Sequence, residues 1–467
     1  MSASRLSLFL LAMMFTASIV PAAPAFAASV SKSSDTKTAA IDVPSVAVTG
    51  YFSARYIFRT AATASGDIAR DQDVYSELRI DATAPKSGRY EFHFMGNVRN
   101  DLDGNRDLHT YYPLEDIGDT GPDHTIGYLY EAHFDVNNPF SRVTQIRMGR
   151  QAGTRDEQVF FDGIAMDIRP ASFLKVTLYG GFAVNLFEIN RSESDDTLAG
   201  AGLDIAAGND TGISLDYLTI KDKRDYLEMS DVQDKLFSFK VWQRFTPYVK
   251  ATARFRYQNS EARDLSVRLL GTFPKAGTEV SANYLRQFST QEQQSNPLSP
   301  FVDVVGPSDP FQTYEVKVRQ FFGKRYAVDL LYSQRVLIGD AQSSTFNREY
   351  SRSAAGFEVG DLFFRNLTLS LTGDQWKSQD RSSTAAGADI GYAFGKKGAL
   401  TKINAGTYYS MYKYDYYLQV QERDDVRTYY LNMKVPVAKQ VVLNFSYEYE
   451  TSLEDFQTIK VGIRYDF

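Results

Sequence analysis

The sequence has no cysteine among its 467 residues, and only four histidines. Without cysteine, the chain can form neither a disulfide framework nor a haem-attachment motif, and it has no thiolate nucleophile. The histidines show no zinc-ligand spacing, and no phosphate-binding glycine loop is present. The neighbours Asp123 and His124 could suggest a hydrolase, but no serine or second carboxylate lies at a spacing typical of a catalytic site with them. We therefore expect no enzyme activity and no cofactor. The histidines are His93, His109, His124 and His133.

Long apolar runs are missing after residue 27, so the sequence does not predict a helical membrane protein. Before that point Arg5 precedes a mostly apolar run from Leu8 to Val20, followed by the small-residue site Ala25-Phe26-Ala27. This is the three-part layout of a secretory signal. We predict a signal peptide over residues 1–27 and no lipoprotein anchor, because no cysteine follows the cleavage site.

The sequence also has no excess of basic residues, because its 51 Lys and Arg are outnumbered by 57 Asp and Glu. This balance argues against a nucleic-acid partner. Aromatic residues are abundant, with 30 Tyr and 32 Phe. Such an excess without helical periodicity suits strands whose outer face meets lipid and whose rings lie at the water interfaces.

Residues 28–45 are rich in Ser, Thr, Ala and Lys, and they predict a flexible periplasmic tail. From Val46 to the end, runs of about ten residues alternate apolar with polar side chains. Near the C-terminus, for example, Leu443 and Phe445 share one face and Asn444 and Ser446 the other. A period of two indicates a strand with one oily and one wet face.

We count about 22 such strands, with a range of 18–24, over residues 46–467. They predict an all-β fold, a transmembrane antiparallel up-and-down β-barrel with both termini in the periplasm. Every second connection is short and turn-like, and the connections between these are mostly longer and more polar. Examples of the short, periplasmic class are Pro85-Lys86-Ser87-Gly88, Arg169-Pro170, Gly208-Asn209-Asp210 and Pro274-Lys275-Ala276-Gly277.

The last strand places Ile459, Val461, Ile463, Tyr465 and Phe467 on one face. An amphipathic strand that ends in phenylalanine resembles the assembly signal of bacterial outer-membrane barrels, with Tyr465 and Phe467 as its aromatic positions. The resemblance implies the outer membrane of a Gram-negative bacterium. It also implies outer-membrane lipid and the outer-membrane assembly machinery as partners.

A barrel of about 22 strands encloses a space too wide for wall side chains to fill, and barrels of this size are usually plugged. Residues 28–45 are too few for an N-terminal plug domain. Three possibilities remain for the lumen: an open pore, a pore narrowed by its own loops, or a sleeve around another protein. We favour the loop-narrowed pore, with residues 101–124 or 288–311 as the constriction.

The predicted inward positions carry more cations than anions. Rings of charge set selectivity in pores, so anionic or polyhydroxylated solutes are favoured. The alternative is that these residues are simply solvated, because barrel interiors are polar in any case. The predicted pore-lining cations are Arg99, Arg147, Lys175, Lys250, Arg254, Arg256, Lys317, Arg319, Lys460 and Arg464, and the anions are Glu91, Glu315, Asp329 and Glu448.

Two short segments, Gly149-Arg150-Gln151 and Phe161-Asp162-Gly163, resemble a pattern in alginate-export-like and related bacterial porins. The resemblance covers about one hairpin. It supports the outer-membrane β-barrel porin superfamily but does not imply alginate as the substrate. Arg150 and Asp162 are the residues that it marks for testing.

Oxygen ligands alternate along residues 101–107, as they do in loops that bind hard cations. The glycine lies at a different position from that of the EF-hand loop, and the closing glutamate is missing. A calcium-type site and an acidic solvated loop are therefore both open. The candidate ligands are Asp101, Asp103, Asn105 and Asp107.

These observations together predict a passive porin-like channel in the outer membrane for small hydrophilic solutes, with anionic solutes favoured. The alternative is a structural role, in which the barrel sheathes a periplasmic or extracellular partner such as a multihaem cytochrome in an electron conduit. Because this chain has no haem-attachment motif, that partner would have to bring the haems.

Overall fold

The computed structural model describes most of the chain from Val46 onward. The chain divides into two units, residues 1–44 and 45–467, and the described residues belong to the second. The predicted signal peptide and tail lie outside them. The described residues are 46–62, 68–84, 88–103, 114, 124–153, 155–157, 159–184, 195–222, 232–289, 309–339, 349–378, 381–396, 399–410, 426–451 and 455–467.

The described part of the second unit is built from 22 β-strands, as the alternation predicted. No helix among the described residues is long and apolar enough to cross a bilayer. In chain order, the strands are β1 (Ala47–Ala62), β2 (Ile68–Thr83), β3 (Tyr90–Asp101), β4 (Thr125–Asn137), β5 (Val143–Ala152), β6 (Phe160–Ala171), β7 (Leu174–Ala183), β8 (Thr197–Ala207), β9 (Thr211–Asp222), β10 (Val232–Thr246), β11 (Val249–Gln258), β12 (Glu261–Phe273), β13 (Thr278–Gln287), β14 (Phe311–Phe322), β15 (Tyr326–Leu337), β16 (Tyr350–Gly360), β17 (Leu367–Ser378), β18 (Arg381–Lys396), β19 (Ala399–Ser410), β20 (Val426–Pro436), β21 (Val441–Thr451) and β22 (Phe456–Asp466).

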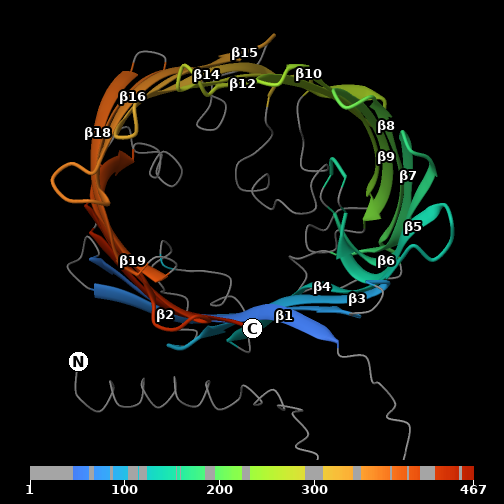
Figure 1. The fold of residues 1–467 in the computed structure, drawn as a ribbon, viewed down its shortest axis with the longest axis horizontal. Helices are drawn as coiled ribbons and strands as arrows, with labels where there is room; N and C mark the ends of the chain where they lie inside the picture. Colours follow the sequence, from blue (N-terminus) through green and yellow to red (C-terminus); the bar gives the residue numbers. More distant parts are fainter. Residues whose placement is uncertain are drawn as a thin grey trace, which may run out of the picture. The chain divides into compact units, whose positions relative to one another are not determined.

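The strands form one closed sheet, in which each strand pairs antiparallel with its neighbours in sequence (Figure 1). Closure comes from β1 and β22, whose register runs from Tyr51 opposite Asp466 to Ala61 opposite Phe456. Gly50 and Phe467 extend this seam with two backbone hydrogen bonds of 3.0 Å. A closed sheet leaves no unpaired edge, which is the condition for strands to lie in hydrocarbon. The predicted up-and-down barrel is confirmed.

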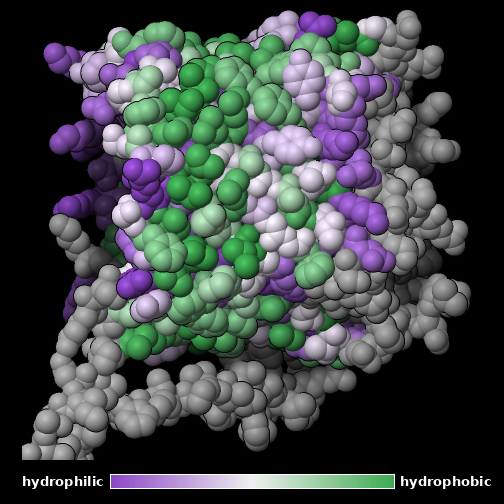
Figure 2. Space-filling model, turned by 90° about the vertical axis from the view of Figure 1, so that its right-hand side faces the viewer, coloured by the Kyte–Doolittle hydropathy of each residue, from purple (hydrophilic) through white to green (hydrophobic). Residues whose placement is uncertain are grey.

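The outer surface of the barrel carries the apolar half of each alternating strand. Many of these side chains are large and exposed, among them Ile164, Leu330 and Tyr332 with 55%, 52% and 46% of their surface exposed. Figure 2 shows the face over the right-hand strands of Figure 1, where hydrophobic residues form much of the surface and hydrophilic residues gather toward its margins. A soluble protein rarely exposes apolar surface on this scale, but a bilayer covers it.

The connections differ between the two rims. We call the rim where β1 begins and β22 ends the near rim, and the opposite one the far rim. Near-rim connections are short, as in residues 172–173 and 247–248, whereas the far rim carries 102–124 and 288–310. The predicted alternation of short and longer connections is therefore confirmed, with two short far-rim exceptions at 259–260 and 379–380.

One predicted turn is displaced. Arg169-Pro170 lies within the last residues of β6, and the turn follows at residues 172–173. The β6–β7 register shifts between Ile168 and Ala171. Proline lacks the N–H that a regular ladder needs, so a strand end with irregular pairing accommodates it.

Candidate functional site

The inner face of the barrel carries the polar half of each strand, in rows that cross from strand to strand. One such row runs from Asp216 through Ser238 and Arg256 to Asp264. The outer face is the apolar one, and side chains alternate between the two faces of a strand. These rows therefore line the lumen.

The loop between β5 and β6, residues 153–159, is fastened to this inner wall. Arg155 donates a hydrogen bond of 2.6 Å to Asp204 on β8, and its Nε donates to Asp216 on β9. The guanidinium lies against Gly202, where a Cβ atom would come within 2.5 Å of its central carbon. Glycine at this position leaves the space that Arg155 fills.

The next residue, Asp156, is held by β10. Lys240 donates to Asp156 Oδ1 at 2.8 Å, and the Ser238 hydroxyl donates to Oδ2. The Asp156 side chain is 6% exposed. A carboxylate this deeply buried needs both a counter-charge and hydrogen bonds, and it has both here.

The third residue of the loop, Glu157, reaches β11 and β12. Its Oε1 accepts hydrogen bonds from Arg256 at 2.7 Å and from Arg263 at 3.1 Å. Arg256 also bridges to Asp264 at 2.7 Å. A register shift in the β11–β12 pairing next to Arg256 marks a β-bulge, which lets the adjacent Arg263 and Asp264 serve the same site. Three consecutive loop residues thus make ion pairs with five successive strands.

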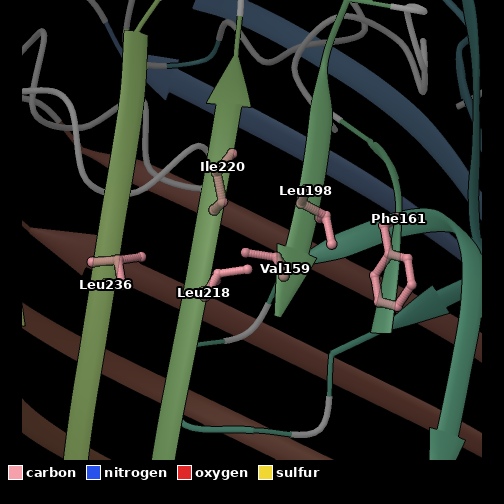
Figure 3. Close-up of a cluster of buried hydrophobic side chains, with 6 residues drawn as sticks. All are labelled: Val159, Phe161, Leu198, Leu218, Ile220 and Leu236. Atoms are coloured by element: carbon pink, nitrogen blue, oxygen red, sulfur yellow. The ribbon is translucent and has the colours of Figure 1, made fainter. Parts of the chain in front are cut away.

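An apolar patch on the same wall completes the attachment. Leu198, Leu218, Ile220 and Leu236 lie at inner positions of β8, β9 and β10, and all are at most 5% exposed. Val159 of the loop and Phe161 at the start of β6 pack against them (Figure 3). Apolar side chains in a watery lumen need such a cover, and burying them stabilises the folded loop. We call Arg155, Asp156, Glu157 and Val159 the clasp.

The pKa values of the clasp agree with its ion pairs. Burial acts to raise the pKa of Asp156, but the hydrogen bonds from Lys240 and Ser238 outweigh it, and the pKa lies below its ordinary value. Burial acts to lower the pKa of Arg155, but Asp204 and Asp216 hold it above its ordinary value. Both groups are therefore charged at neutral pH.

The sequence analysis expected residues 101–124 or 288–311 to narrow the pore. Most residues of these two loops lie outside the described part of the chain, so that expectation stays a prediction. The clasp was missed, although two signals for it exist. One is the run Arg155-Asp156-Glu157, and the other is the set of leucines at inner positions, which breaks the alternation.

The predicted pore-lining cations divide into two groups. Most pair with carboxylates of the wall: Arg147 with Asp135 at 2.9 Å, Lys175 with Asp167 at 2.8 Å, Arg319 with Glu358 at 2.7 Å, Arg464 with Asp466 at 2.8 Å, Lys460 with Glu448 at 3.9 Å, and Arg256 as described. Arg99, Lys250, Arg254 and Lys317 have no carboxylate within 4.0 Å among the described residues. Arg99 instead lies over the rings of Tyr75 and Tyr128, and Lys250 over Trp242.

Cations gather in one hollow of the inner wall, about 900 Å³ in volume. We call it the basic hollow. Its charged lining is Arg55, Arg99, Lys402, Lys434, Lys460, Arg464 and Glu77. Lys402 and Lys434 are directly opposite each other in the β19–β20 register, and four asparagines and several hydroxyls complete the lining. The sequence analysis missed these two lysines.

The basic hollow and the clasp lie on opposite sides of the ring. The hollow spans β19 to β22 and β1 to β3, whereas the clasp rests on β8 to β12. In a closed ring of 22 strands, β10 and β21 are half a circumference apart. The described residues of loop 153–159 therefore contact the wall opposite the basic hollow.

Part of the predicted cation loop is described. Asp101 and Asp103 come together with Asp71 of β2, with one oxygen of each within 4.8 Å of the others. Asp101 also meets His124 Nδ1 at 3.2 Å, and Asp103 accepts a hydrogen bond from the Gln72 N–H at 2.9 Å. Asn105 and Asp107 lie outside the described residues, as do Asp123 and His109, so this cation site stays a prediction.

Arg150 and Asp162 form a two-pronged ion pair between β5 and β6, with distances of 2.7 and 2.6 Å. By strand alternation, they lie on the outer face, next to the exposed Met148 and Ile164. They are therefore not pore-lining residues. The aromatic pair predicted as an assembly signal, Tyr465 and Phe467, lies at the β1–β22 seam with ring centroids 6.0 Å apart.

The architecture is similar to that of known barrels. The P pilus usher (PapC) translocation pore matches with a TM-score of 0.50 and 10% identity, over 89% of this chain and 99% of that one. A BenF-like porin from Pseudomonas fluorescens Pf-5 matches with a TM-score of 0.42 and 11% identity, over 90% and 98%. OccAB3 of Acinetobacter baumannii gives 0.40 and 10%, over 90% and 99%. No protein-family model and no curated protein matches the sequence.

At such low identity, a structural match establishes the fold alone, and the PapC pore is the match that carries it. The closed antiparallel sheet, its apolar outer surface and its polar inner rows agree with this comparison. The chain has the fold of the bacterial outer-membrane β-barrels.

Proposed function

We propose that this protein is a passive channel in the outer membrane of a Gram-negative bacterium, with small hydrophilic solutes as its substrates and a preference for anions. On this proposal, residues 1–27 are removed on export and residues 28–45 form a periplasmic tail. The driving force is the solute gradient, because the described residues contain no nucleotide-binding or redox motif.

The observation that carries the proposal is that the docked loop and the cationic lining lie on opposite sides of the inner wall. The clasp fastens loop 153–159 to β8–β12, where it takes space from the lumen without crossing to the other side. The basic hollow lies on the opposite wall, with six cations and one carboxylate in its lining. A solute that passes between them meets a polar surface with a positive potential, which favours anions.

The lining suits solutes with several oxygen atoms. Lys402, Lys434 and Arg464 offer charge-assisted hydrogen bonds to carboxylate, sulfate or phosphate groups. Asn404 and Asn432 lie beside them and can both donate and accept, as hydroxyl-rich solutes require. Weak contacts spread along a wall allow entry and release, which a passive channel needs.

Single-channel recording of the purified, refolded protein in a planar bilayer tests the proposal. We expect stable open steps, and a reversal potential in a salt gradient that shows anion preference. Open steps with cation preference would overturn the proposed anion preference, but the proposed channel function would still hold. A correctly folded barrel without conductance would overturn the channel itself and favour a barrel filled by a partner protein.

A further inference from the structure

Two of the four histidines meet on the inner wall, and neither belongs to the clasp or to the lining of the basic hollow. His93 of β3 and His133 of β4 are opposite each other in the strand register, with ring centroids 4.8 Å apart. His133 is 5% exposed. Three carboxylates surround the pair: Asp81 of β2, Glu91 of β3 and Asp135 of β4.

The hydrogen bonds leave one nitrogen of His93 facing these acids. Its Nδ1 lies 2.6 Å from Asp81 Oδ1, so the Nδ1–H donates to that carboxylate and Nε2 carries the lone pair. Nε2 lies 3.5 Å from Glu91 Oε2 and 3.9 Å from Asp135 Oδ2. Both separations are longer than hydrogen bonds.

These separations fit a shared metal ion. Nitrogen and oxygen ligands lie about 2.0–2.2 Å from Zn²⁺ in a tetrahedral site, so neighbouring ligand atoms are roughly 3.4 Å apart. His93, His133 and Asp135 each offer one ligand atom, and these atoms lie within 4.8 Å of one another. Glu91 Oε2 is near enough to His93 Nε2 to supply a fourth ligand.

We propose that His93, His133 and Asp135, together with Glu91, form a binding site for a divalent transition-metal ion such as Zn²⁺ on the inner wall. Two imidazoles and two carboxylates are a ligand set that suits zinc better than calcium or magnesium, which prefer oxygen alone. The site does not rest on the proposed channel function, because it requires only the folded barrel.

The surrounding residues support the ligands as outer-shell partners do in metal sites. Asp81 orients His93 and is itself held by Arg79 at 2.8 Å. Asp135 is held by Arg147 at 2.9 Å and by Gln145 at 2.9 Å. A carboxylate on the far nitrogen of a ligating histidine fixes its tautomer and raises its basicity. The three carboxylates exceed the two guanidiniums by one negative charge, which favours a bound cation.

Isothermal titration of the full-length barrel in detergent, free of any polyhistidine tag, with Zn²⁺ alone tests the site. We expect one Zn²⁺ per chain, with much weaker binding of Ca²⁺. His93→Gln and His133→Gln should each lower the affinity by at least about 10-fold, and Asp81→Asn by about 10- to 100-fold through its effect on His93. Glu448→Gln, which changes an inner-wall carboxylate of β21 paired with Lys460, is the control and should bind as the unaltered protein does.

Zinc-edge X-ray absorption of the loaded barrel gives an independent readout, and we expect two imidazoles in the first coordination sphere. Absence of Zn²⁺ binding, binding unaltered by both histidine variants, or coordination without imidazole would each overturn the proposal. If His133→Gln does not fold, as judged by heat-modifiable electrophoretic mobility, the more exposed His93→Gln decides the outcome alone.

Discussion

Glu157 accepts a hydrogen bond of 2.7 Å from Arg256, although the two residues lie 99 positions apart in the sequence. The contact joins the far-rim loop between β5 and β6 to the inner face of β11. Because Arg155 and Asp156 make equivalent contacts with β8, β9 and β10, this loop is docked along a stretch of wall rather than at one point. Its docking is therefore expected to set the free cross-section of the lumen.

Removing the first contact of the clasp should loosen the loop. Arg155→Ala leaves Asp216 without its guanidinium partner at a position where only 10% of the Asp216 side chain is exposed. An unpaired group of this kind costs about 1–3 kcal/mol, which lowers the ratio of docked to undocked loop by about 5- to 150-fold. In planar-bilayer recordings, we expect a larger and noisier single-channel current. Arg244→Ala, which removes the exposed near-rim pair with Asp210, is the control. An unchanged current in Arg155→Ala would mean that the loop does not limit conduction.

A change at Gly202 should have the same effect without removing any charge. A Cβ atom at this position would lie 2.5–2.6 Å from the Arg155 guanidinium atoms, so Gly202→Val displaces the side chain from its two carboxylates. We expect the current of this variant to resemble that of Arg155→Ala, and the double variant to add little, because both act on one contact. Additive effects would show that Gly202 acts through the strand and not through the clasp.

Acid should release the loop through Asp156. Its pKa lies below the ordinary value of 3.8, so its contribution to docking is fully present above that value and is lost as the pH falls through the lowered pKa. We expect a constant current from neutral pH down to about pH 5, and a rise at lower pH. Asp156→Asn cannot titrate, so its current should lose this component of the pH profile. An identical profile in the variant would show that Asp156 does not cause the response.

Charge selectivity should depend on the basic hollow. Lys402→Gln together with Lys434→Gln removes two facing cations, and the reversal potential in a salt gradient should move toward cation preference. The shift should be partial, because four arginine and lysine residues remain in the lining. Lys439→Gln, in the exposed near-rim connection between β20 and β21, is the matched control. Equal reversal potentials in the variant and the control would exclude the hollow as the source of selectivity.

The sequence predicted the barrel well because one physical constraint acts on every strand. Lipid on one side and water on the other impose a period of two, and Leu443, Asn444 and Phe445 show it without any tertiary information. The clasp was not predictable in this way, since its partners depend on which loop folds onto which strands. The pairing of His93 with His133 depends likewise on the β3–β4 register, which includes a shift between Met95 and Gly96. Sequence spacing across a long connection cannot supply that register.

The outer-face ion pair gives a prediction about stability rather than transport. Arg150 is 10% exposed in its side chain and is neutralised by Asp162 through two hydrogen bonds. Asp162→Ala removes the carboxylate that accepts these two hydrogen bonds from Arg150, and we expect a loss of about 1–3 kcal/mol in unfolding free energy. Arg150→Leu combined with Asp162→Leu should restore most of the loss, because apolar side chains suit a lipid-facing position. Urea unfolding in lipid vesicles, followed by heat-modifiable mobility, measures both. If the double variant is as unstable as Asp162→Ala, the pair does more than cancel a charge, and its geometry itself holds β5 and β6 together.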